Sequence, residues 1–62
     1  MLDGHPDRAV AMSRLGDALR RTGDGAAAAP LLREAHATLS RVLGAEHRLT
    51  KDAAARLAAL PR

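Results

Sequence analysis

Three histidines are the first residues in this sequence that could do chemistry, because imidazole nitrogens are common zinc ligands. They are His5, His36 and His47. No two of them stand four residues apart, the spacing that brings two ligands onto one face of a helix, and the chain has no cysteine to add a thiolate. We therefore expect no metal site. We interpret His5 and His47 as structural residues that bond the backbone at the entrance of a helix.

Ser13, His36 and Asp17 together contain the residue types of a hydrolase triad. No nucleophile elbow, glycine-rich phosphate loop or pair of buried carboxylates accompanies them in the sequence. The fold that the sequence predicts is a thin helical hairpin, which also has no deep pocket that would exclude water from a reaction. The sequence therefore predicts a protein that is not an enzyme and that carries no cofactor.

The charges favour neither a membrane nor a nucleic acid. The net charge is +3, but acidic residues are interspersed among the arginines. A DNA-binding helix-turn-helix is the least favoured alternative, because the helix after its turn would begin GAAAAPLL, which offers no side chain to a base edge. The chain has no apolar run long enough for a membrane span, and its start, MLDGHPD, lacks the features of a signal peptide. We expect a cytoplasmic protein.

Apolar residues at helical spacing predict an all-α chain that begins with a helix over about residues 6–21. Pro6 suits its first position, where a missing N–H costs nothing. The turn residues TGDG end it. The apolar residues on one face of this helix are Met12, Leu15 and Leu19.

Two more helices complete the predicted fold. Asp24 can cap a second helix over about residues 25–43, and Gly44 suits the left-handed position that closes it. Thr50 can cap a third helix over about residues 50–60. Because the connections are short, neighbouring helices should be antiparallel. We expect an antiparallel helical hairpin plus a third helix.

The chain also repeats itself when it is shifted by 42 residues. Loop then matches loop, and one helix face matches another. The loop GAEHRLT thereby overlaps GHPDRA near the start of the chain, with His47 on His5. The identities are His5 with His47, Ala11 with Ala53, Arg14 with Arg56, and Leu15 with Leu57.

Small and large residues follow in a characteristic order: Leu15, Gly16, Leu19, Gly23, Ala28, Leu32 and Ala35. With AAAAPLLREA and the two similar loops, they resemble the tetratricopeptide repeat (TPR), in the 42-residue form of kinesin light chains and many bacterial arrays. The likeness covers residues 5 to about 58, or about one and a half repeats. Nine of the ten basic residues are arginine and alanine is abundant, which indicates a GC-rich bacterial genome.

The resemblance implies that Gly16 and Ala28 are small because paired helices approach closely there. The space around that contact would be filled by Leu15, Leu19, Leu32 and Leu39. Ser13 and Arg14 stand where asparagines are common in the first helix of the family. The whole of residues 1–62 would be one TPR-like unit, a segment of an α-solenoid.

The resemblance also implies a function, since the first helix of each pair lines a concave surface that binds proteins or peptides. Arg20 and Arg21 are the expected contacts of an acidic partner. We expect a non-catalytic protein–protein interaction module, either a fragment or a terminal part of a longer scaffold. The alternative is a homo-oligomer that forms through the open apolar edges of the solenoid. The expected partner-binding residues are Val10, Ser13, Asp17, Arg20, Arg21, Ala55, Arg56 and Ala59.

Overall fold

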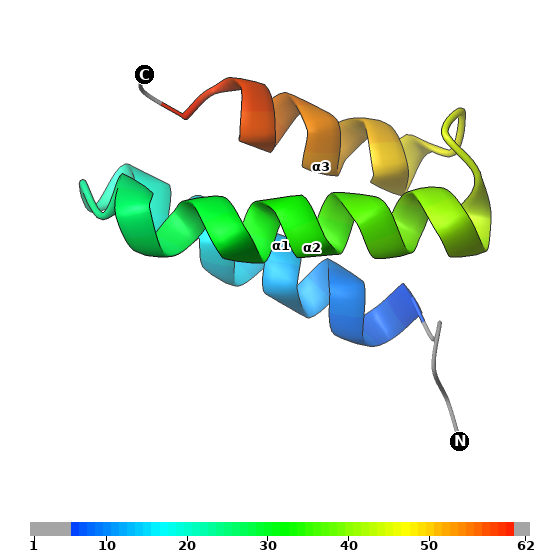
Figure 1. The fold of residues 1–62 in the computed structure, drawn as a ribbon, viewed down its shortest axis with the longest axis horizontal. Coiled ribbons are helices and arrows are strands. Elements are labelled where there is room, and N and C mark those ends of the chain that lie inside the picture. The colour runs from blue at the N-terminus through cyan, green and yellow to red at the C-terminus, as the bar shows by residue number, and fades with distance from the viewer. Residues whose placement is uncertain (1–5, 61–62) are drawn as a thin grey trace.

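The computed structural model describes residues 6–60, which form three α-helices and no strand (Figure 1). Helix α1 spans Pro6–Arg21, α2 spans Gly25–Leu43 and α3 spans Arg48–Ala58. Each helix runs antiparallel to the next, as the colours of Figure 1 show. The all-α class and the hairpin followed by a third helix are confirmed.

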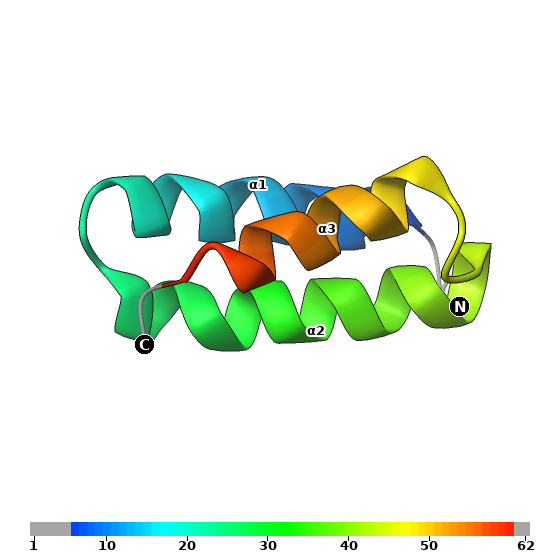
Figure 2. The same cartoon turned by 90° about the horizontal axis from the view of Figure 1, so that it is seen from above.

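Helix α2 is the centre of the molecule. It packs against both α1 and α3, whereas α1 and α3 contact each other at few places. Seen from above (Figure 2), α1 and α3 lie on the same side of α2. Helices α1 and α3 therefore both pack on α2.

The core is built mainly from small residues, so the helices must lie close together to bury it. Its fully buried apolar residues are Ala9, Ala28, Leu32, Ala35, Leu39 and Ala53. Helices α1 and α2 approach each other closely at Gly16. A Cβ atom added there would lie 2.7 Å from Cγ and 2.8 Å from Cδ2 of Leu32. The expectation that Gly16 is small because two helices meet there is confirmed.

Leu15 does not fill the space around this contact, contrary to the expectation. Its residue surface is 53% exposed, while Leu32 and Leu39 are fully buried and Leu19 is half-buried. The reason is helical geometry: Gly16 faces α2, and the preceding residue points about 100° away from it. Leu15 therefore lies at an apolar edge of α1.

The ends of α2 have the predicted caps. The Asp24 carboxylate accepts a hydrogen bond from the N–H of Ala27 at 3.3 Å. Gly44 has a φ of 94° and donates its N–H to the Ser40 carbonyl at 3.0 Å. Asp24 thus satisfies a free donor at the start of the helix, and glycine supplies the positive φ that ends it.

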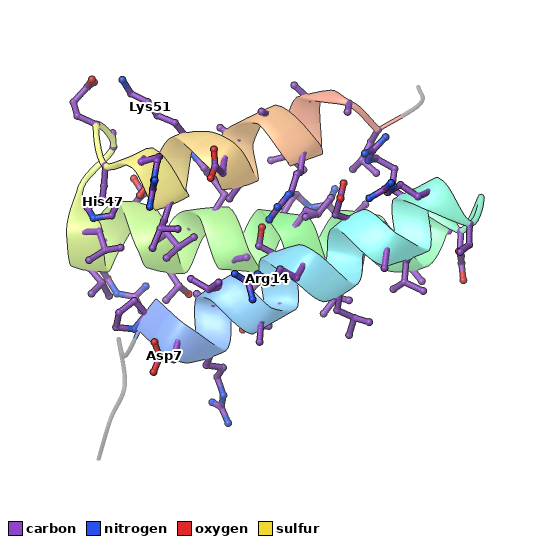
Figure 3. The ribbon with its side chains drawn as sticks, turned by 180° about the vertical axis from the view of Figure 1, so that it is seen from behind. Asp7, Arg14, His47 and Lys51 are labelled. Carbon is purple, nitrogen blue, oxygen red and sulfur yellow. The ribbon has the colours of Figure 1, made fainter. Side chains whose placement is uncertain are left out.

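Thr50 does not cap α3, and the expected range of 50–60 is two residues late. The helix begins at Arg48, and His47 is its N-cap: the Nδ1 atom of His47 accepts the N–H of Leu49 at 3.1 Å. Figure 3 shows His47 at the turn between α2 and α3. The structural role predicted for His47 is confirmed, and His5 lies outside the described residues.

Thr50 instead lies in the first turn of α3, where it is 1% exposed. Thr50 and Ala53 are three residues apart, so they share the face of α3 that is buried. Within residues 6–60, the Thr50 hydroxyl has no hydrogen-bond partner. Its methyl group therefore serves the packing of α3, and its oxygen plays no part in the cap.

We predict that Gly16→Val destabilises the chain by about 2 kcal/mol, because the added carbons overlap a leucine that is buried on all sides. Ala11→Val places valine at an exposed position of the same helix, without the overlap, and should cost about 0.5 kcal/mol. The loss of helical circular dichroism with urea measures both. Equal losses for the two variants would contradict the close approach at Gly16.

Candidate functional site

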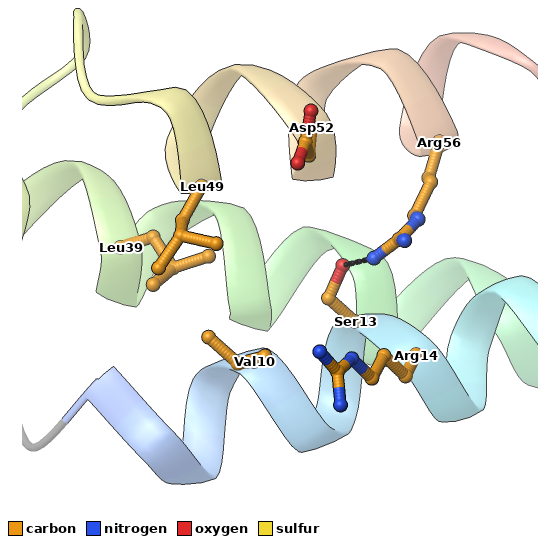
Figure 4. A pocket seen from close by; sticks show the side chains of 7 residues that line it. All are labelled: Val10, Ser13, Arg14, Leu39, Leu49, Asp52 and Arg56. Carbon is orange, nitrogen blue, oxygen red and sulfur yellow. Dashed lines mark hydrogen bonds between the residues drawn. The ribbon is translucent and has the colours of Figure 1, made fainter.

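A pocket of about 50 Å³ lies between α1 and α3 (Figure 4). One end is apolar and contains Leu39 of α2 beside Leu49 of α3. The other end carries two guanidinium groups, one from α1 and one from α3. The lining residues are Val10, Ser13, Arg14, Leu39, Leu49, Asp52 and Arg56.

A hydrogen bond between α1 and α3 fixes one of these guanidinium groups. The Nη1 atom of Arg56 donates to the Ser13 hydroxyl at 2.7 Å (Figure 4). Ser13 is 2% exposed, so its oxygen has little access to water. A bond from a charged donor in such a place is stronger than one in solvent. Ser13 therefore joins the two helices and holds Arg56 at the pocket.

A second set of charges, Asp17, Arg20 and Arg21, follows on α1, and we call it the Asp17 cluster. Oδ1 of Asp17 accepts hydrogen bonds from Nη2 of Arg20 at 2.7 Å and from Nε at 3.2 Å. Nη1 of Arg21 lies 3.8 Å from Oδ2, and this side chain is 73% exposed. Asp17 is therefore held mainly by Arg20, and Arg21 contributes little.

The arginines around Asp17 lower the pKa of its carboxyl group below the ordinary value. The largest cause is the hydrogen bond from Arg20, and desolvation opposes it. The charges of Arg20, Arg56 and Arg21 lower the pKa further. The field of Arg56 thus reaches Asp17, which connects the cluster electrostatically with the pocket.

The residues predicted to bind a partner divide into three groups. The first lines the pocket: Val10, Ser13 and Arg56. The second forms the Asp17 cluster: Asp17, Arg20 and Arg21. The third group is Ala55 on α3 and Ala59 at its C-cap; both are exposed and neither lines the pocket. A role of any of them in binding stays a prediction.

Arg14 and Asp52 line the pocket but were not among the predicted residues. The 42-residue repeat contained the signal for both, since Arg14 is equivalent to Arg56 and Asp52 is equivalent to Val10. Arg14 is exposed and, in the described part of the chain, makes no hydrogen bond or ion pair. Figure 3, which shows the molecule from behind, has Arg14 on the near side of α1. It is the cation of this pocket that has no internal partner.

Ser13 accepts from Arg56 and Asp17 from Arg20, so an arginine rather than His36 holds each of them. Residues 6–60 contain no group of three or more histidine, aspartate or glutamate side chains that could hold a metal ion. None of the described helices has the length and apolar content needed to cross a membrane.

The family model described as tetratricopeptide repeat matches residues 8–49. The chain belongs to the tetratricopeptide repeat family. The match includes most of α1, all of α2 and the turn that leads to α3. The paired helices of the TPR unit therefore supply the contact at Gly16 and the α1 side of the pocket. No curated protein and no solved structure matches the chain.

The lowered pKa of Asp17 gives a prediction about acid stability. Because this pKa is lower in the folded than in the unfolded chain, the ionised carboxylate stabilises the fold above the unfolded pKa. That contribution is lost as pH falls through the folded pKa. Asp17→Asn lacks the contribution, so its urea midpoint should change less than that of the wild type between about pH 5 and about pH 2.

Glu34→Gln is the matched control for this experiment, because it removes one negative charge from an exposed position of α2. Circular dichroism at each pH gives the midpoints. An acid response of Asp17→Asn equal to that of the wild type would contradict the stabilising role of the cluster.

Proposed function

We propose that this chain is a non-catalytic protein-interaction module that binds an acidic peptide segment in the pocket between α1 and α3. Membership of the TPR family supports a role in protein interaction. The single observation that carries the acidic preference is the guanidinium of Arg14, which has no partner within residues 6–60 and lies beside that of Arg56 at one end of the pocket. Charge and shape therefore favour the same kind of ligand.

Each part of the pocket has a task in this proposal. Arg14 can offer two parallel N–H groups to a carboxylate, the strongest geometry for such a contact. Arg56 uses one nitrogen for Ser13 and keeps other donors for the ligand. The apolar end at Leu39 and Leu49 can take a small apolar group next to the acidic one.

Asp52 limits which acidic segments fit. Its carboxylate lies on the α3 side of the pocket, as Figure 4 shows. A negative group of the ligand is repelled there and is attracted toward Arg14 on the α1 side. The proposal therefore favours a peptide whose acidic residue is placed against α1. The cytoplasmic location expected from the sequence stays a prediction.

Arg14→Glu should weaken binding of a labelled hexaglutamate peptide by about tenfold, which corresponds to about 1.4 kcal/mol. Arg33→Glu is the matched control, because it changes the net charge equally from an exposed position of α2 outside the pocket. Fluorescence anisotropy at low salt measures both affinities. A loss in Arg33→Glu as large as that in Arg14→Glu would show an attraction of overall charge without a site.

A labelled DNA duplex of 12 base pairs is the second probe for the wild type under the same conditions. The proposal predicts weaker binding to the duplex than to hexaglutamate, because acidic residues interrupt the basic surface. Tighter binding to the duplex, with a steep dependence on salt, would favour the helix-turn-helix alternative.

Exposed apolar residues support self-association as a second candidate function. Leu15 is 53% exposed and Val42 is 37% exposed. Leu57 is equivalent to Leu15 in the repeat and is half-buried in α3. A leucine at this position can therefore be part of a packed surface. A second copy of the chain could cover it.

If the chain forms a homodimer, sedimentation should give the mass of two copies for the wild type. Leu15→Glu should give the mass of one copy, because the charge blocks an apolar contact. Ala37→Glu, on the exposed part of α2, is the control and should retain the mass of two copies. A mass of one copy for the wild type at high concentration would exclude the homodimer.

A further inference from the structure

We infer that Asp17 sets the specificity of the concave face: it acts as an internal acidic ligand that competes with an outside carboxylate for the arginines. The inference rests on the proposed function, because it describes how an acidic peptide gains access to that face. Its basis is the geometry of the Asp17 cluster and its position beside the pocket.

The cluster resembles the contact that an acidic ligand would make. One oxygen of Asp17 accepts two N–H groups of the same guanidinium, at 2.7 and 3.2 Å. The side chains of Asp17 and Arg20 are only 17% and 28% exposed, so the pair is sheltered from water and ions. The Nε–Nη2 edge of Arg20 is therefore occupied, and an arriving carboxylate has to displace Asp17 to bind that edge.

The carboxylate also stands next to the pocket itself. Asp17 follows Arg14 by three residues and Ser13 by four, so its side chain is a neighbour of both on α1. Arg56 lies close enough to lower the pKa of Asp17. The negative charge of Asp17 thus opposes a second negative charge at the pocket, even where the two do not share an arginine.

The 42-residue repeat has no second carboxylate at this position. The equivalent residue is Ala59, the C-cap residue that follows α3; it is exposed and has no side chain to form such a pair. Asp17 likewise contributes nothing to the buried apolar core. Its cluster therefore acts on charge at the concave face more than on helix packing.

Asp17→Asn should bind labelled hexaglutamate about threefold more tightly than the wild type, since it releases Arg20 and removes the like charge. Glu34→Gln removes one negative charge from an exposed position of α2, so it controls for net charge and should change affinity by less than about 1.5-fold. Circular dichroism of each variant checks that the helices are retained.

A measurement on the wild type keeps the inference testable if Asp17→Asn does not fold. The Arg20 Nε–H resonance, followed by NMR during titration with hexaglutamate at neutral pH, should move as the peptide displaces Asp17. An unchanged resonance at saturation would overturn the inference, because the peptide would then bind without competing for Arg20.

The outcomes separate this inference from the proposed function. If the wild type binds and Asp17→Asn gains no more than Glu34→Gln, the competition is disproved and the proposed function stands. If Asp17→Asn binds and the wild type does not, the competition is supported in its strongest form. If no folded variant binds hexaglutamate, both the inference and the acidic preference of the pocket are wrong.

Discussion

The close approach of α1 and α2 at Gly16 is the contact on which the other features depend. The side chain of Leu32 occupies the space that a Cβ at position 16 would need, so only glycine permits this separation. The buried residues around it are mostly alanines, which contribute little area unless the helices are close. The same contact fixes the rotation of α1 about its axis. Val10 and Arg14 are thereby directed toward the space between α1 and α3.

Helix α3 adds the second wall of the pocket to this hairpin. It packs on α2 through small buried residues and contacts α1 at few places, so the pocket between α1 and α3 stays open. The bond from Arg56 to Ser13 holds its cationic end together. Two arginines of the predicted partner-binding set are thus engaged by their own chain, Arg56 by Ser13 and Arg20 by Asp17. A carboxylate of a ligand would then have to compete with Ser13 for Arg56 and with Asp17 for Arg20.

Local patterns in the sequence were sufficient for the fold and only partly for the site. Apolar spacing and turn residues predicted the helices, and Asp24 acts as the expected cap. The start of α3 was misplaced because Thr50 is a good cap by type. The repeat places Arg48 opposite Pro6, which is the correct start. The repeat likewise contained Arg14, as the equivalent of Arg56. Which arginine pairs with which acceptor depends on side-chain rotamers and distances, which no local pattern contains.

The most direct test of the account is an NMR map of the backbone amides of the wild type during titration with hexaglutamate. We expect the largest changes in amide chemical shift around the pocket, at Val10, Arg14 and Arg56, with further changes at Asp17. Amides on the exposed part of α2 around Arg33 should change little. Shifts concentrated on α2, or spread evenly over all exposed arginines, would contradict the claim that the space between α1 and α3 is the binding site.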